Sequence, residues 1–167
     1  ELVSEEHPHY KSLRWQSFGL NNENGPKIIE TSPKGTSFKL GDKTYNTNVI
    51  GQHNILNLAS IILFAQAEGF SFDAISDSIT SLKMVRRRQE LRGYYRGAPV
   101  IDDFAHHPKA VDLTLSGLKV TYPGKKLIVV MEANSATARS NIFQNEFEKA
   151  LEHSDEVLFA KPARPTS

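Results

Sequence analysis

The 167-residue sequence contains no cysteine. This absence excludes disulfide scaffolds, thiolate metal sites and cysteine nucleophiles. An excess of charge of one sign is also lacking, because 20 Lys and Arg stand beside 19 Asp and Glu, for a formal net charge of +1. The charge balance therefore indicates neither nucleic acid nor an anionic membrane as a partner.

Long hydrophobic runs are missing as well. The longest apolar stretch, residues 58–67, is interrupted by Ser60 and Gln66 and is far shorter than the about 20 residues that cross a bilayer. The N-terminus is acidic, whereas a signal peptide begins with basic and then apolar residues. With 39% hydrophobic residues the chain can form a core, and we expect a soluble, cytoplasmic protein.

The first half of the chain predicts an irregular start, a hairpin and two helices. Residues 1–35 hold several prolines and an Asn-rich run, which are typical of loops. β-branched residues on either side of a Gly-Asp turn predict a hairpin over residues 36–50. Apolar residues at helical spacing predict a helix that opens at residues 51–54 and stops at Gly69, and Ser71 suits the N-cap of a shorter second helix.

The second half predicts an α/β unit. From Pro99 onward the order is strand, helix, strand, helix, strand, which is typical of a Rossmann-like, mainly parallel sheet. The continuous apolar run at residues 127–131 predicts a strand buried on both faces. Ligands of such sheets bind beyond the carboxyl ends of the strands. We therefore expect residues 1–84 to form one remnant and residues 85–167 a separate Rossmann-like unit.

The loop after the first of these strands concentrates polar chemistry. Residues 102–108 read Asp-Asp-Phe-Ala-His-His-Pro, and a carboxylate at this place accepts hydrogen bonds from ribose hydroxyls in dinucleotide folds. Pro108 suits the first turn of a helix. One alternative is a capped helix with solvent-facing histidines. Another is a metal site, although adjacent histidines seldom face one ion.

Two further patterns are candidates for nucleotide contact. Asn54 and Asn57 share a face on the first turn of the predicted helix, and their amides match the donors and acceptors of an adenine edge. The alternative is that His53 and Asn54 only cap the helix. Arg88 ends a run of three arginines, where a guanidinium can clamp a phosphate unless the run is merely solvated. The sequence contains no phosphate-binding loop and no G-x-G-x-x-G fingerprint.

Taken in order, these motifs resemble those of the Mur ligases. Residues 51–57, Gly-x-His-Asn-x-x-Asn, are similar to the adenine-side motif at the end of that family's central ATPase domain. Arg88-x-Glu90 is similar to the entry of its C-terminal domain, and residues 103–108 are similar to its ribose-side motif. The resemblance is greatest to the murein peptide ligases, and next to the UDP-N-acetylmuramate–L-alanine ligases.

The resemblance implies an enzyme that uses ATP and Mg²⁺ to join murein tripeptide to UDP-N-acetylmuramate. It places the side chains of His53, Asn54 and Asn57 around the adenine. Asp103 would hold the ribose hydroxyls, and Arg88 would reach the terminal phosphates as the catalytic residue. The alternatives are an L-alanine ligase and, from another class of protein, a non-enzymatic nucleotide-binding module.

The resemblance also implies where the incoming peptide binds. His106 and the loop that carries Ser135, Thr137 and Arg139 would face it. Residues 132–137 read Glu-Ala-Asn-Ser-Ala-Thr, whereas the murein peptide ligases have Glu-Pro-Arg-Ser-Asn-Thr, so Arg139 would have to replace a missing arginine. The Mg²⁺ ligands, the phosphate loop and the UDP-sugar domain would lie upstream of residue 1. We therefore expect a fragment that is inactive alone.

Overall fold

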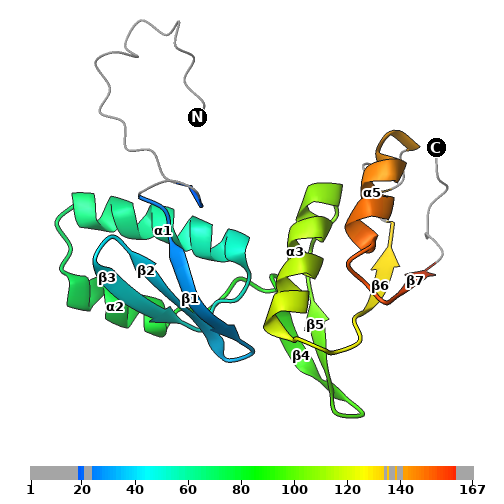
Figure 1. Ribbon diagram of the computed structural model, residues 1–167, viewed down its shortest axis with the longest axis horizontal. Helices are drawn as coiled ribbons and strands as arrows, with labels where there is room; N and C mark the ends of the chain where they lie inside the picture. Colours follow the sequence, from blue (N-terminus) through cyan, green and yellow to red (C-terminus); the bar gives the residue numbers. More distant parts are fainter. Residues whose placement is uncertain (1–18, 21–23, 134, 136–137, 139–140, 161–167) are drawn as a thin grey trace, which may run out of the picture.

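The computed structural model describes residues 19–20, 24–133, 135, 138 and 141–160. The chain folds into two halves that lie side by side and are joined by a short linker before residue 90 (Figure 1). Each half has its own hydrophobic core. No helix in the described part of the chain is long and apolar enough to cross a membrane.

The first half contains a three-stranded antiparallel sheet. Its strands are β1 (Lys27–Ser32), β2 (Gly35–Leu40) and β3 (Lys43–Thr47), in that order. The predicted hairpin is confirmed as β2 and β3, whereas the prediction of an irregular start is wrong because β1 lies within it. β1 is an edge strand with largely exposed side chains, so it lacks the alternation of apolar residues that marks a half-buried strand.

The two predicted helices are confirmed, and they pack against this sheet. They are α1 (Gln52–Ala67) and α2 (Phe72–Thr80). Ser71 is the N-cap of α2, since its Oγ accepts a hydrogen bond from the Ala74 N–H at 3.3 Å. The buried core comprises Phe38, Leu40, Tyr45, Val49, Ile55, Leu58, Ala59, Ile62, Ile75 and Ile79.

The second half is a mixed α/β unit, so the predicted fold class is confirmed. Its elements are β4 (Glu90–Tyr95), β5 (Ala98–Asp102), α3 (Pro108–Thr121), β6 (Ile128–Glu132), the short 3₁₀ helix η2 (Asn141–Phe143), α5 (Gln144–Leu151) and β7 (Glu156–Ala160). The first two strands form an antiparallel hairpin, and the last two are parallel. In the described part of the chain β5 is not hydrogen-bonded to β6.

Among the described residues, one face of β6 is covered and the other is open. Val129 and Met131 pack against the core that α3 and α5 form with them. On the opposite face Ile128 is 51% exposed and Val130 is 73% exposed. The prediction of a strand buried on both faces is therefore wrong for the described residues, because apolar composition does not reveal whether a second layer covers the strand.

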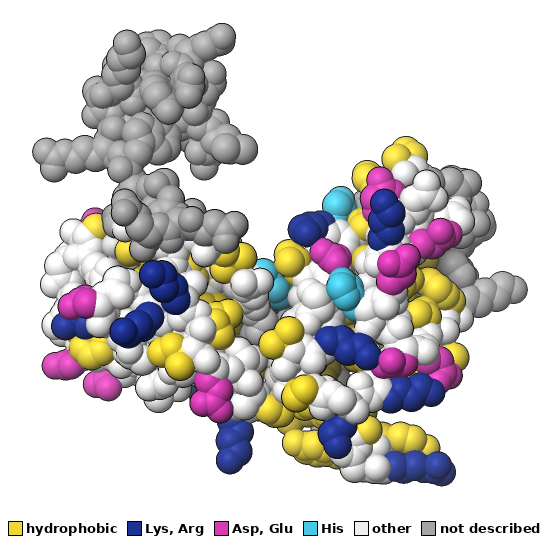
Figure 2. Space-filling view, viewed as in Figure 1, with side chains coloured by type: hydrophobic (Ala, Val, Ile, Leu, Met, Phe, Trp, Pro, Cys, Tyr) yellow, Lys and Arg dark blue, Asp and Glu magenta, His cyan; other side chains and the backbone are white. Residues whose placement is uncertain are grey.

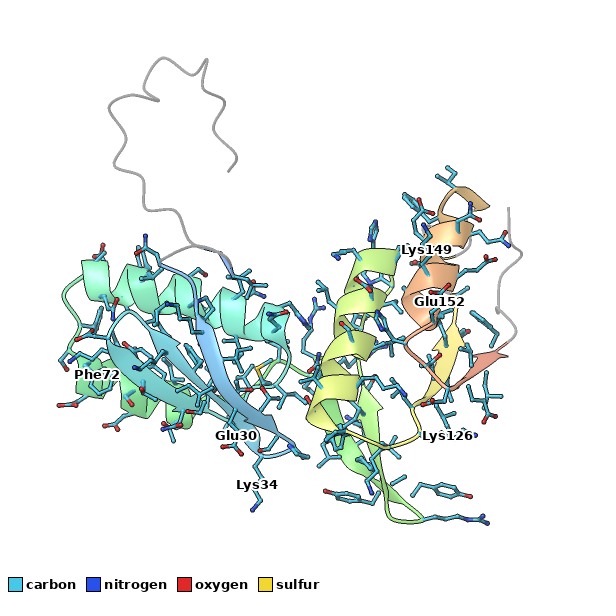
Figure 3. The ribbon with its side chains drawn as sticks, viewed as in Figure 1. Glu30, Lys34, Phe72, Lys126, Lys149 and Glu152 are labelled. Carbon is cyan, nitrogen blue, oxygen red and sulfur yellow. The ribbon has the colours of Figure 1, made fainter. Side chains whose placement is uncertain are left out.

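Polar contacts fasten the start of β6 to the start of β7. Lys126, which is labelled in Figure 3, lies two residues before β6, and its ammonium group pairs with Glu156 at 2.7 Å. Asp155 accepts a hydrogen bond from the Leu127 N–H at 2.7 Å and pairs with Lys119 of α3. The hydrogen bond from the Leu127 N–H, and to a smaller extent the one from the Lys119 ammonium, lower the pKa of the Asp155 carboxyl. The carboxylate thus stays charged and joins a helix to two strands.

The two halves approach each other closely at a pair of glycines. Gly117 lies in α3, and Gly51 precedes α1. A Cβ added to Gly117 would lie 3.5 Å from the Gly51 Cα, which is ordinary van der Waals contact. A small side chain therefore fits at position 117, and a large one would separate the halves.

We expect Gly117→Ala to raise the free energy of unfolding by roughly 0.5–1 kcal/mol, because glycine inside a helix costs about this much relative to alanine. The added methyl would meet Gly51 at an acceptable distance. Urea unfolding followed by circular dichroism measures the effect. Gly117→Leu is the control, since its longer side chain should lower stability. A loss of stability in the alanine variant would contradict the described contact.

Candidate functional site

A cavity of about 450 Å³ lies between the two halves, where the surface is hollowed in the space-filling view (Figure 2). α1 lines one side, and the linker, the end of β5 and α3 line the other. Most of the remaining wall is apolar. The polar lining residues are His53, Asn54, Asn57, Arg88, Asp103 and Thr114. The structure therefore brings all five residues of the predicted nucleotide site to one cavity.

The first turn of α1 shows that its polar residues are not simple caps. The N-cap is Gly51, with φ 86°, and no side chain caps the helix. Asn54 instead turns back, and its Nδ2 donates to the Ile50 carbonyl at 2.9 Å. Asn57 lies one turn further along the cavity wall. The capping alternative for His53 and Asn54 therefore does not describe this helix.

His53 is half-buried and favours its neutral form. Its buried Nδ1 has no hydrogen-bond partner among the described residues. Burial lowers the pKa of His53, while the nearby Asp103 carboxylate raises it and the Arg88 guanidinium lowers it. A neutral imidazole offers one donor and one acceptor, so His53 can meet a polar ligand without bringing charge to the cavity.

Asp103 is held from three directions. Its Oδ2 accepts a hydrogen bond from the Gln89 N–H at 2.9 Å. Its Oδ1 accepts from the Ala105 N–H at 2.7 Å and from the buried Thr114 hydroxyl at 3.4 Å. Each carboxylate oxygen has two lone pairs, so the group can still accept a hydrogen bond from a ligand. Its orientation is set before any ligand arrives.

Arg88 lies on a linker that is tied to the loop after β5. The Phe104 N–H donates to the Arg87 carbonyl at 2.8 Å. The Phe104 ring centroid lies 5.1 Å from the guanidinium carbon of Arg87 and 5.8 Å from that of Arg88. These cation–π contacts restrain two exposed cations. The arginine run is therefore not merely solvated at its last two positions.

The predicted peptide-side residues are only partly described. Ser135 Oγ donates to the His106 carbonyl at 3.3 Å, so the loops after β5 and β6 meet. Neither residue lines the cavity. Thr137 and Arg139 lie outside the described residues. His107 caps α3 by accepting from the Lys109 N–H at 3.3 Å, and both His106 and His107 are exposed, as the alternative of a capped helix with solvent-facing histidines predicts.

Metal ligation finds no support in the described part of the chain, which contains no group of three or more His, Asp or Glu residues able to hold an ion.

Two residues that shape the site were not predicted from the sequence. Thr114 is buried inside α3 and Gln89 is buried in the linker. Neither belongs to a recognisable local pattern, because each acquires its role through contacts with Asp103 that only the fold creates.

We expect His53 to titrate below the ordinary imidazole pKa of 6.5, because burial disfavours the cation. Asp103→Asn should lower the pKa of His53 further, and Arg88→Ala should raise it, since each variant removes one of the two opposing charges. NMR titration of the His53 ring measures these shifts. Identical titrations in both variants and the wild type would show that neither charge acts on the imidazole.

Because its folded-state pKa lies below the unfolded value, His53 binds protons less readily in the folded chain. The stability of the folded chain is therefore unaffected by this group above pH 6.5, and it falls as the pH drops from 6.5 through the lower folded-state pKa of His53. A His53→Gln variant should lose less stability as the pH falls between the unfolded and folded pKa values of His53, because glutamine does not titrate.

The match to a known protein family begins at the boundary between the two halves of the chain. Residues 87–167 match a family model described as Mur ligase, glutamate ligase domain. A UDP-N-acetylmuramate–L-alanine ligase of a Roseiflexus species is 32% identical over 75% of this chain and 27% of the relative. The ligase of the same name from Clostridium kluyveri is 36% identical over 71% of this chain and 26% of the relative. The chain thus spans about a quarter of these relatives.

Solved structures share the fold. A UDP-N-acetylmuramate–alanine ligase from Thermotoga maritima superposes with a TM-score of 0.71 at 22% identity, covering 85% of this chain and 33% of that one. A murein peptide ligase from Psychrobacter arcticus gives a TM-score of 0.53 at 26% identity, covering 86% and 31%. A MurF ligase from Thermotoga maritima in complex with ADP gives 0.65 at 23%, covering 85% and 34%. The second half of this chain, residues 87–167, is therefore similar to the Mur ligase, glutamate ligase domain family.

Proposed function

We propose that this chain is part of an ATP-dependent ligase that joins an amine to UDP-N-acetylmuramate in peptidoglycan synthesis. One observation carries the proposal: His53, Asn54, Asn57, Arg88 and Asp103 converge on a single cavity. They come from three separate motifs that resemble those of Mur ligases. A scattered arrangement would have favoured a structural role for each motif.

The two halves would belong to different domains of the ligase. Residues 1–84 would be the end of a central ATP-binding domain, and residues 85–167 would be part of a C-terminal domain. The separate cores and the start of the family match at residue 87 support this division. The sequence holds no phosphate-binding loop, so we expect the 167 residues alone to catalyse no ligation.

The cavity chemistry fits a nucleotide. Apolar residues of its wall, among them Leu58 and Val85, would flank a flat base. The amides of α1 would meet the edge of adenine, and the preorganised Asp103 carboxylate would accept hydrogen bonds from ribose hydroxyls. The Arg88 guanidinium would lie toward the phosphates, where a planar fork of donors suits phosphate oxygens.

The proposed reaction forms an amide in two steps. ATP would transfer its terminal phosphoryl group to the lactyl carboxylate of UDP-N-acetylmuramate, giving an acyl phosphate and ADP. The incoming amine would attack the acyl carbon, and the tetrahedral intermediate would expel phosphate. Arg88 would offset negative charge during phosphoryl transfer. Mg²⁺ would supply further charge neutralisation, held by ligands outside the described residues.

Two amines are candidates, and L-alanine is the better supported. The curated relatives quoted above are named as L-alanine ligases. Residues 132–137 also lack the Pro-Arg pair expected of murein peptide ligases. The murein tripeptide remains the second candidate, because residues 86–93 and 102–108 resemble the recycling enzymes and one of those enzymes is a structural neighbour.

Asp103→Ala should weaken ATP binding to the full-length protein by roughly 1.5–3 kcal/mol, the usual effect of losing hydrogen bonds to a charged acceptor. Arg88→Ala should lower turnover more than affinity, because phosphate charge redistributes in the transition state. Calorimetric titration and steady-state kinetics separate the two effects. Since Asp103 also holds the linker, Asp103→Asn serves as the control for altered folding. Unchanged ATP affinity in Asp103→Ala would remove the ribose role.

The full-length protein should release ADP when supplied with ATP, UDP-N-acetylmuramate and L-alanine. The tripeptide L-alanyl-γ-D-glutamyl-meso-diaminopimelate, offered in parallel, should react more slowly. Faster turnover of the tripeptide would reassign the enzyme to recycling. If neither amine supports ADP release, the ligase proposal fails. Ligation by residues 1–167 alone would contradict the proposal that these residues cannot catalyse the reaction without the rest of the enzyme.

A further inference from the structure

Gln89 is a buried residue at the end of an exposed arginine run. The residue is 8% exposed, whereas the three arginines before it are exposed. Neither Nε2 nor Oε1 of its amide has a hydrogen-bond partner among the described residues. Burying an unpaired amide costs stability, so some other interaction must hold this side chain in place.

The side chain of Gln89 packs against the start of α1. A Cβ added to Gly51 would lie 3.0 Å from Gln89 Nε2 and 3.1 Å from Oε1. The same point lies 3.3 Å from Cε1 of His53. The amide and the imidazole therefore both pack against the N-cap glycine of the helix that carries the proposed adenine contacts. Any larger residue at position 51 would push the amide away.

The main chain of Gln89 is fastened to the other side of the cavity. Its N–H donates to Asp103 Oδ2 at 2.9 Å. One residue thus contacts the N-cap glycine of α1 through its side chain and the ribose-side carboxylate through its backbone. The spacing between the two groups depends on the length of this side chain.

The backbone of the linker is strained on both sides of Arg88. Arg87 has φ 60° and Gln89 has φ 50°, which is the left-handed region that non-glycine residues rarely adopt. Such strain persists where surrounding contacts impose it, and it clusters at functional sites. Here the bonds from Phe104 and to Asp103 impose it. Arg88, between the two strained residues, lines the cavity.

We propose that Gln89 is a positioning residue of the nucleotide site. Its side chain is a spacer that sets α1 at a defined separation from Asp103, and its left-handed backbone directs Arg88 to the cavity. The ligand named here rests on the proposed function. The spacer itself rests on the contacts of Gln89 with Gly51 and Asp103, which do not depend on the identity of the ligand.

Two variants separate positioning from folding. Gln89→Met keeps the length of the side chain and removes the unpaired amide, so it should be at least as stable as the wild type and bind ATP within about twofold of it. Gln89→Gly removes the spacer and relieves the left-handed strain, so it should bind ATP about tenfold more weakly, since small misplacements of binding groups lower activity steeply. Calorimetric titration of the full-length protein, beside urea unfolding, measures both quantities.

A purely structural role predicts a different pattern. In that case ATP affinity would follow stability, and the two variants would bind equally well once folded. Equal affinities in Gln89→Met and Gln89→Gly would therefore overturn the inference. Weaker binding by the glycine variant alone, without a matching loss of stability, would support it.

A second measurement needs no nucleotide. Residues 1–167 contain no cysteine. In the full-length protein, with any cysteine outside these residues replaced, spin labels on Glu68→Cys at the end of α1 and on Val120→Cys in α3 report the distance between the two halves. The distance distribution should be narrow in the wild type and in Gln89→Met, and broader in Gln89→Gly. An unchanged distribution in the glycine variant overturns the spacer. If the wild type does not bind ATP but the distance distribution broadens in Gln89→Gly, the proposed function is overturned and the spacer role of Gln89 is supported.

Discussion

The Asp103 carboxylate accepts hydrogen bonds from three segments that the chain brings together only on folding. The linker supplies the Gln89 N–H, the loop after β5 supplies the Ala105 N–H, and α3 supplies the Thr114 hydroxyl. A part-buried N–H without a partner costs free energy, so this carboxylate stabilises the linker and the loop at once. The direction of Arg88 and the wall of the cavity both depend on it.

Each half of the molecule has a core of its own, so folding does not by itself set how the halves face each other. Their separation is set where Gly51, Gly117 and Gln89 meet. The two glycines allow main chains to approach closely, and the glutamine amide limits the approach. A cavity lined from both sides is therefore sensitive to residues that do not line it.

Local signals were sufficient for much of the fold and for part of the site. Ser71 and Pro108 marked helix starts correctly, because capping and a missing N–H act within one turn. β1 was missed because an exposed edge strand shows no apolar alternation, and the open face of Ile128 and Val130 was missed because composition does not reveal what covers a strand. The role of Gln89 had no local signal, since it arises from contacts distant in sequence.

In the proposed ligase, the identity of the amine would depend on the residues after β6 rather than on the fold. The L-alanine ligase and the murein peptide ligase both superpose on this chain, and the better superposition has the lower sequence identity. Position 134 carries Asn, where the resemblance to the murein peptide ligases predicts Arg. A neutral amide cannot pair with a distant peptide carboxylate as a guanidinium fork does. L-alanine carries its one carboxylate beside the reacting amine and needs no such distant partner, so Asn134 is compatible with the proposed L-alanine substrate.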